Sequence, residues 1–345
     1  MTPPTTRPRR PGPVGRRWAV VGVVALLLVL LVASVAVGSR SIDPATVWDA
    51  LTAPDPADDE HTTVRLLRIP RTALIVLVGS ALGAAGTVMQ AMTRNPLAEP
   101  GLLGVNAGAA AGVVTGGVVT GSLATAGLWV YVYAMVGAAC AATAVYALGG
   151  ALSKGSNPVR LVLAGVALAA VLSAYTSAVL VSFPEVFDWF RFWDTGSFQG
   201  PAADVLGPTA VLVGAGLLVS LALTRSLNAL ALGPELGRSL GVHPRRAWLG
   251  SGAAVVLLAG SATAAAGPIA FVGLVAPLVA RAIVGPDYRR LLPLAVLLAV
   301  CVLLASDVVG RLLVLPSELE ASIVCALLGA PFFISVVRRR RVPRL

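Results

Sequence analysis

Side chains that catalyse reactions or bind metals are few in this sequence and lie far apart. The chain has three cysteines, Cys140, Cys301 and Cys325, and two histidines, His61 and His243. The cysteines fall inside long apolar runs without the spacing of a metal site, which favours small, buried packing residues. Nucleophilic catalysis needs a nucleophile beside a base, and these residues offer no such pair. The sequence therefore predicts no catalytic site, no metal site and no cofactor.

The sequence also lacks a motif that binds nucleotide phosphates. A nucleotide-binding P-loop needs a lysine within a Gly-Lys-Ser/Thr run, because that lysine must reach the terminal phosphates. Lys154 is the only lysine, and it follows Ser153 and precedes Gly155. If ATP powers this protein, another chain must hydrolyse it.

The distribution of charge predicts the elements that surround these sparse polar groups. The chain is 57% hydrophobic and only 12% charged, whereas soluble domains are about one quarter charged. Long runs lack Asp, Glu, Lys and Arg, and most are near the roughly 20 residues that span a bilayer as a helix. These runs are Trp18–Ser39, Thr72–Thr93, Pro100–Ser153 (two spans), Leu161–Pro184, Val205–Thr224, Ala247–Ala280 (two spans, broken near Gly267), Leu291–Gly310 and Ala321–Val337. They predict an all-α, polytopic membrane protein with about ten transmembrane helices.

Basic residues predict how these helices are oriented. With a cytoplasmic N-terminus, all but six of the 26 basic residues lie in cytoplasmic segments, as the positive-inside rule requires. We expect a disordered basic cytoplasmic tail at residues 1–17, a single transmembrane domain at 18–338 and a second basic cytoplasmic tail at 339–345. The net charge of +10 then reflects contact with anionic lipid and requires no nucleic acid.

Two short segments resemble each other. Residues 79–86 read GSALGAAG and residues 260–267 read GSATAAAG. They fall in the second and seventh predicted helices, which cross the membrane in opposite directions, so they predict an inverted internal repeat of the kind found in transporters. Close helix packing by small residues, or chance in a chain rich in Gly and Ala, would also explain them.

Three longer blocks resemble the FecCD-type permeases. The first runs from Arg68 to Ala109 and contains RIPRTALIVLVGSALGAAG; the others are GPIAFVGLVAPLVARAIVGPDYRRLLP from Gly267 and ASDVVGRLL followed by LPSELEASIVCALLGAPFF from Ala305. The resemblance implies a type II ABC importer permease in the bacterial cytoplasmic membrane, with both termini cytoplasmic. It also implies a dimer with a second permease, identical or paralogous, two ABC ATPase subunits and an extracytoplasmic substrate-binding protein. The implied cargo is a ferric siderophore, with cobalamin or haem as alternatives.

Two positions depart from the family's pattern. Leu278 stands where the family usually has histidine, and the run from Glu318 to Cys325 lacks the usual proline, glycine and threonine. These departures suggest a non-identical second permease. An ion-coupled secondary transporter is the less favoured alternative, because its coupling would need acids within the spans, which are almost free of them.

A proline-rich break follows the second predicted helix. Residues 94–104 read RNPLAEPGLLG, in which the prolines stop the helix and the glycines allow a tight reversal. One interpretation is a structural re-entrant turn packed against protein. The other is part of an inner gate, formed by Asn95, Pro96, Glu99, Pro100 and Gly101.

The longest cytoplasmic loop apart from the tail runs from Ser226 to Arg246. It contains leucines among glycines, and Pro234 begins a short helix there. The resemblance implies that this helix couples to the ATPase through Leu232, Gly233, Glu235, Leu236, Gly237, Arg238 and Gly241. A helix lying on the lipid surface is the alternative.

Arginines mark the outer ends of two predicted helices: Arg68 and Arg71 begin the second, and Arg311 ends the ninth. The resemblance implies that they receive carboxylates from the binding protein, a role suited to the forked guanidinium group. Alternatively, they simply mark the membrane ends, with Arg311 paired to Asp307 one turn earlier.

Overall fold

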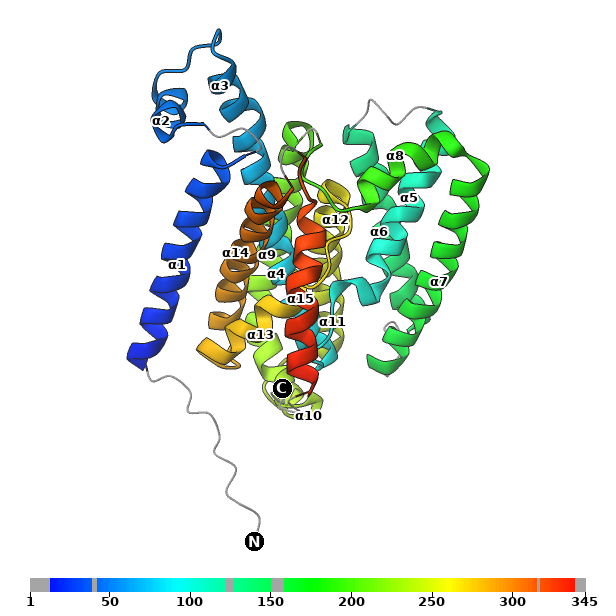
Figure 1. Cartoon of the computed structure of the whole chain (residues 1–345). Coiled ribbons are helices and arrows are strands. Elements are labelled where there is room, and N and C mark those ends of the chain that lie inside the picture. The colour runs from blue at the N-terminus through cyan, green and yellow to red at the C-terminus, as the bar shows by residue number, and fades with distance from the viewer. Residues whose placement is uncertain are drawn as a thin grey trace.

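The structure is a computed structural model that describes residues 13–38, 42–121, 127–149, 158–200, 202–314 and 317–338, and its elements are helices (Figure 1). In chain order they are α1 (Pro13–Ala36), α2 (Pro44–Thr52), α3 (Asp59–Thr62), η1 (Thr63–Arg68), α4 (Ile69–Thr93), η2 (Pro100–Leu103), α5 (Val105–Thr120), α6 (Gly127–Leu148), α7 (Pro158–Ser182), α8 (Pro184–Asp194), α9 (Ala202–Ala231), α10 (Pro234–Ser239), α11 (Pro244–Val255), η4 (Val256–Gly260), α12 (Ser261–Ala266), α13 (Val272–Val284), α14 (Tyr288–Leu313) and α15 (Ala321–Arg338).

The described residues contain ten apolar helical segments, as the charge-free runs predict. Seven are long and apolar enough to cross a membrane: residues 14–36, 59–93, 127–148, 159–182, 202–231, 244–266 and 288–313. Three are shorter, namely Val105–Thr120, Val272–Val284 and Ala321–Ser335. The first helix begins at Pro13, inside the predicted N-terminal tail, while residues 1–12 and 339–345 lie outside the described part of the chain.

The bundle has two distinct ends. One end carries α2, α3 and α8, and we call it the α8 end (Figure 1). The other carries α10, together with the start of α1 and the end of α15, and we call it the α10 end (Figure 1).

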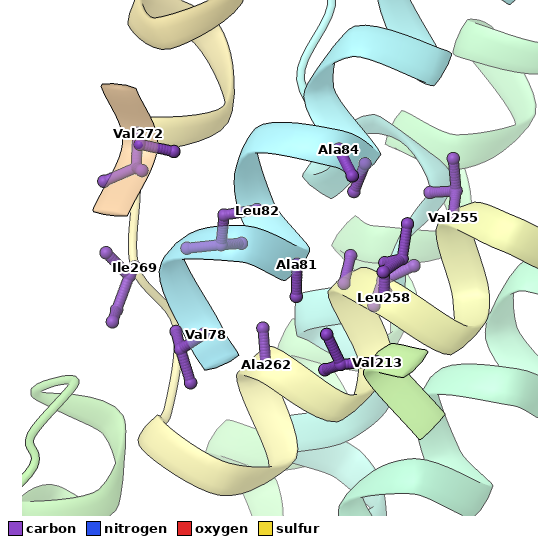
Figure 2. Packing of buried hydrophobic residues seen from close by; sticks show 14 of the residues in the cluster. Val78, Ala81, Leu82, Ala84, Val213, Val255, Leu258, Ala262, Ile269 and Val272 are labelled. Atoms are coloured by element: carbon purple, nitrogen blue, oxygen red, sulfur yellow. The ribbon is translucent and has the colours of Figure 1, made fainter. Parts of the chain in front are cut away.

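Helix α4 forms the centre of the core and packs against α9, α12, α13 and α14. Glycines on α4 allow this close approach: a Cβ at Gly79 would lie 2.9 Å from Val300 Cα, and one at Gly83 would lie 2.7 Å from Ala299 Cβ. Figure 2 shows Ala81 of α4 in the same part of the core as Ala262 of α12. Small residues thus let backbones come close in a bundle where the hydrophobic effect contributes little to helix association.

The two similar segments lie in helices that run in opposite directions. The first copy is in α4, and the second is in α12 and the residues next to it. Helix α4 leads from the α8 end toward the α10 end, whereas α11 and α12 lead the other way (Figure 1). This is the relation that an inverted repeat requires.

Each copy is followed by a break in the helical chain. After α4, Arg94 takes a left-handed conformation at φ 51°, and the next α-helix begins only at Val105, with the short 3₁₀ turn η2 between them. After α12, Gly267 and Phe271 have φ 72° and 67°, and α13 begins only at Val272. Because α13 has 13 residues, it is about 20 Å long, shorter than the roughly 30 Å hydrocarbon core. In the segment before it, Gly267 and Ile269 are buried, whereas Ala270 is exposed.

Candidate functional site

The three arginines predicted at the outer rim lie at the α8 end, where Arg71 and Arg311 share a network of ion pairs. Arg71 Nη2 lies 2.7 Å from Asp307 Oδ1, and Arg71 Nη1 lies 2.7 Å from Glu318 Oε2. Arg311 pairs with the other oxygen of Asp307. The local Arg311–Asp307 pair weighed at the sequence level is therefore present, and it extends to Arg71 and Glu318.

Two of these arginines also bind the end of α1. Arg68 Nη1 donates to the carbonyl oxygens of Val35 at 2.9 Å and Ala36 at 2.7 Å. Arg311 Nη1 donates to the carbonyl oxygens at positions 34 and 37, at 2.8 and 3.0 Å. The last carbonyls of a helix lack partners within the helix, so these guanidinium groups act as its C-terminal cap.

This network leaves little guanidinium surface exposed. Arg311 is 2% exposed and Arg68 is 7% exposed. All three arginines nevertheless line a hollow of about 570 Å³, together with Glu318, residues 198–200 and residues 202–203. Their reception of partner carboxylates stays a prediction, and any incoming carboxylate would compete with Glu318.

Helix α10 presents the opposite situation. Leu232, Leu236 and Leu240 are 63%, 58% and 63% exposed. Glu235, Arg238 and Gly241 are exposed as well, while Gly237 is buried. Gly233 and Gly241 flank the helix at φ 114° and 79°, conformations that favour glycine. The sequence thus folds a short helix with exposed Leu236 on it and with exposed Leu232 and Leu240 beside its two ends.

The α10 end is fixed to the bundle by Asp287. Its Oδ1 accepts from Asn228 Nδ2 at 2.7 Å and from the backbone N–H of Arg289 at 3.1 Å. Partial desolvation raises the pKa of Asp287, but these two hydrogen bonds outweigh it and hold the pKa below its usual value. Because Asn228 is in α9 and Asp287 caps α14, the contact joins these two helices just beside α10.

The break at residues 94–104 links three regions of the bundle. Arg94 Nη2 donates to the carbonyl of Leu230, just before α10, at 2.9 Å. Glu99 Oε1 accepts from the backbone N–H of Phe271, at the start of α13, at 3.1 Å. Within the break, Asn95 Oδ1 accepts from Leu97 N at 3.0 Å, and Pro100 begins a short 3₁₀ turn. Glu99 thus satisfies a backbone donor at the N-terminus of a helix, where negative charge is favoured.

Several polar residues at this junction escaped sequence reasoning. Gln90 Nε2 donates to the carbonyl of Leu274 at 3.2 Å, and Thr263 Oγ1 donates to Asn106 Oδ1 at 2.9 Å. Each contact joins the first repeat half to the second across more than 150 residues. The only available signal was an isolated amide in an apolar run, which does not identify its partner.

The described residues hold no group of three or more His, Cys, Asp or Glu side chains that could bind a metal. Cys140, Cys301 and Cys325 are free; the last two are buried as predicted, but the prediction is wrong for Cys140, which is exposed on α6. Among the described residues, ten apolar helical segments, two breaks in the helical chain and a short helix with exposed leucines at one end are the features of a polytopic membrane permease.

The chain belongs to the FecCD transport family, whose model matches residues 26–339. It is a permease subunit of an ABC transporter and not itself an ATPase. A permease of this class works with separate ATPase and binding-protein chains.

Named relatives cover nearly the whole chain. The ferric enterobactin transport system permease protein FepD of Escherichia coli is 41% identical over 95% of this chain and 97% of its own length. The probable siderophore transport system permease protein YfiZ of Bacillus subtilis is 35% identical, with 94% and 96% coverage. The hemin transport system permease protein HmuU of Yersinia pestis is also 35% identical, with 93% and 96% coverage.

A solved structure shares the fold. It is described as an inward-facing conformation of a metal-chelate type ABC transporter. The match has a TM-score of 0.79 and 26% identity, and it covers 94% of this chain and 99% of that chain. The predicted all-helical architecture of a type II importer permease is thereby confirmed.

Proposed function

We propose that this chain is the permease subunit of an importer that moves a ferric siderophore across the bacterial cytoplasmic membrane. The observation that carries the proposal is the near-complete coverage by relatives named for ferric enterobactin and other siderophores. Haem import is the second candidate, because one relative of similar coverage is named for hemin. Cobalamin import by the same mechanism is a third.

The test is uptake of radioactive iron chelates into proteoliposomes that contain the permease, its ATPase and its binding protein. We expect uptake of a ferric siderophore to require ATP and to persist when ion gradients are collapsed. Uptake driven by an ion gradient without ATP would instead support a secondary transporter. The same uptake measurement with hemin and with cobalamin decides among the three cargoes.

We further propose that the α10 end faces the cytoplasm, so that both termini are cytoplasmic. The concentration of arginines in the segments at this end supports the orientation. In a cysteine-free background, single cysteines placed at Leu51 and Leu236 provide the test. A membrane-impermeant maleimide applied to spheroplasts should label the cysteine at Leu51, on α2, and spare the cysteine at Leu236.

Helix α10 is proposed as the coupling helix that docks on the ATPase. The exposed Leu236 on the helix, with Leu232 and Leu240 beside its ends, supports this assignment, since an apolar patch outside the bundle needs a cover. A second permease copy, identical or paralogous, would provide the second docking helix for a pair of ATPases.

The break at residues 94–104 is proposed as part of the inner gate. Two contacts support this role: Arg94 binds the carbonyl of Leu230 beside α10, and Glu99 binds the N-terminus of α13. Movement of α10 on its ATPase would therefore be transmitted through the break to a helix that starts inside the membrane.

At the α8 end, Arg68, Arg71 and Arg311 are proposed to face the binding protein. The hollow that they line supports the proposal, and Glu318 is the internal carboxylate that a partner carboxylate would replace. Glu318→Gln should therefore tighten binding-protein docking at low salt, and high salt should reduce the gain. An unchanged affinity across the salt series would contradict this docking site.

A further inference from the structure

The segment from Gly267 to Phe271, which links α12 to α13 and which we call the strap, ends in a strained residue. Phe271 precedes α13 at φ 67°, a left-handed conformation that bulky side chains rarely adopt. The break after α4 ends in the same conformation at Gly104, which precedes α5 at φ 70°. Glycine adopts this conformation without strain, whereas phenylalanine keeps it only where its surroundings hold it. This difference between the two halves indicates that a side chain is needed at Phe271.

Two contacts hold Phe271 in this conformation. Its backbone N–H donates to Oε1 of Glu99, in the break at residues 94–104, at 3.1 Å. A Cβ added at Gly329 would lie 2.5 Å from Phe271 Cβ, so the aromatic side chain lies directly against the backbone of α15. Phe271 therefore joins the break to α15.

The other end of the strap packs against the end of α8. A Cβ added at Gly267 would overlap the carbonyl oxygen of Trp193, and one added at Gly196 would lie 2.6 Å from the carbonyl oxygen of Pro268. A cavity of about 400 Å³ at the α8 end borders this contact, with Trp193 in its wall. The strap therefore runs from the α8 end to the break.

Packing between these two ends holds the strap in place. Ile269 is 5% exposed and lies in the same buried apolar cluster as Val78 and Leu82 of α4 (Figure 2). Ser322 Oγ, near the start of α15, donates to the carbonyl of Thr195, so α15 is tied to the outer end as well. Because close-packed interiors transmit strain, a change of the backbone at the end of the strap is passed on to α13 and α15.

We propose that Phe271 is a two-state positioning residue for transport. In the state seen here, Glu99 holds it left-handed and its ring lies on α15. When the break moves and Glu99 releases the N–H, Phe271 returns to the right-handed conformation, α13 extends at its N-terminus, and the ring leaves Gly329. The inference rests on the proposed role of the break as an inner gate, and it adds α15 as the helix that the gate moves.

The first test is Phe271→Gly, which removes the ring and the strain together. If the left-handed residue only ends the strap, glycine is the better residue there, and the variant should import a ferric siderophore like the parent. If Phe271 has two states, glycine stabilises the left-handed one, so the variant should unfold close to the parental temperature and import about tenfold more slowly. ATP-driven uptake and thermal unfolding of the reconstituted complex measure both quantities.

The second test approaches the same contact from α15. Gly329→Ala adds a Cβ that overlaps Phe271 Cβ, so it should lower the unfolding temperature and slow uptake. Adding Phe271→Gly removes the overlap, so the double variant should regain the unfolding temperature but not the uptake. Gly214→Ala, in α9, is the control, because its added Cβ would have no neighbour from the rest of the described chain within 4 Å.

The third test follows the strap itself. Ala270 is exposed beside Phe271, so a cysteine placed there in a cysteine-free background reports the local backbone through its rate of reaction with a maleimide. With Phe271 present, we expect ATP and vanadate to change this rate about fivefold, and with Phe271→Gly we expect no change.

Parental uptake by Phe271→Gly or by the double variant would overturn the proposal and leave the strap a structural turn. A rate at Ala270 that ATP and vanadate leave unchanged, in a complex that imports, would also overturn it without affecting the proposed function. A parent complex without ATP-driven uptake would overturn the proposed function, and the two-state residue with it.

Discussion

The arginines of the α8 end and the leucines at α10 were both predicted to contact partner proteins, but they differ in burial and in their internal contacts. Arg68 and Arg311 are buried and both donate hydrogen bonds to carbonyls at the end of α1. Arg311 also pairs with Asp307. Leu232, Leu236 and Leu240 are each more than half exposed. A charged group in a membrane bundle is retained only where internal partners neutralise it. The exposed leucines lie outside the bundle, where the bundle does not cover them. They therefore indicate an external partner more strongly than the buried arginines do.

The largest effect is expected from Arg311→Ala. This change leaves α1 without two of its capping bonds and leaves Asp307 with only Arg71. Breaking a buried pair costs about 3–5 kcal/mol, so the purified variant should unfold at a clearly lower temperature and accumulate poorly in membranes. Arg65→Ala, at an exposed position in η1, is the control and should behave like the parent.

The opposite result for Arg311→Ala would make the arginines, like the leucines, residues that bind a partner protein. If the Arg311→Ala protein is stable and has lost only its affinity for the binding protein, the main role of the arginine is docking and not stabilisation of the fold. Thermal unfolding and binding-protein affinity must therefore be measured on the same preparation.

At the other end, Leu236→Asp should leave the fold intact and uncouple transport. The carboxylate is tolerated in solvent but disfavoured in an apolar groove, so ATP-driven uptake should fall at least about tenfold while the thermal unfolding temperature changes little. Leu51→Asp, on an equally exposed leucine of α2, is the control. If both variants transport at the parental rate, α10 does not dock.

The sequence predicted the helices well because their signal is local. Each charge-free run marks one span or, when it is long, two, and the break at Gly267 was visible from its glycine and the proline that follows it. The Arg311–Asp307 pair was also within reach, since the two residues are four positions apart in one helix.

Long-range pairing could not be read in the same way. Arg71 meets Glu318 across 247 positions, and Glu99 meets Phe271 across 172. No local pattern names such partners, since each depends on how the two halves pack. The cavity of about 400 Å³ at the α8 end was missed for a related reason, because its walls come from α4, α6, α8, α9 and α12, and only the fold brings these helices together.

An intermediate effect on transport is expected at Glu99. This residue joins the break after α4, in the first repeat half, to the start of α13, in the second. Glu99→Ala removes the acceptor for the Phe271 N–H, and loss of such a cap costs about 1 kcal/mol. Glu99→Gln keeps an acceptor oxygen. We therefore expect the alanine variant to import about fivefold more slowly and the glutamine variant to stay close to the parent in ATP-driven uptake. Equal damage from both would show that the charge, rather than the hydrogen bond, matters at this break.

The smallest effect is expected at Asp287, which holds the base of the α10 end without touching its leucines. Because hydrogen bonds hold its folded pKa below the unfolded value, the stabilisation is fully present above about pH 4 and is lost as pH falls through the folded pKa. Asp287→Asn should therefore lower the thermal unfolding temperature slightly at pH 7 and not at all at the lowest pH at which the parent still folds. Thermal unfolding of the two proteins across that range measures the difference, with Asp49→Asn, at an exposed position on α2, as the control. A constant difference at every pH would mean that the side chain acts by shape alone, and the α10 end would then be fixed by packing, not by charge.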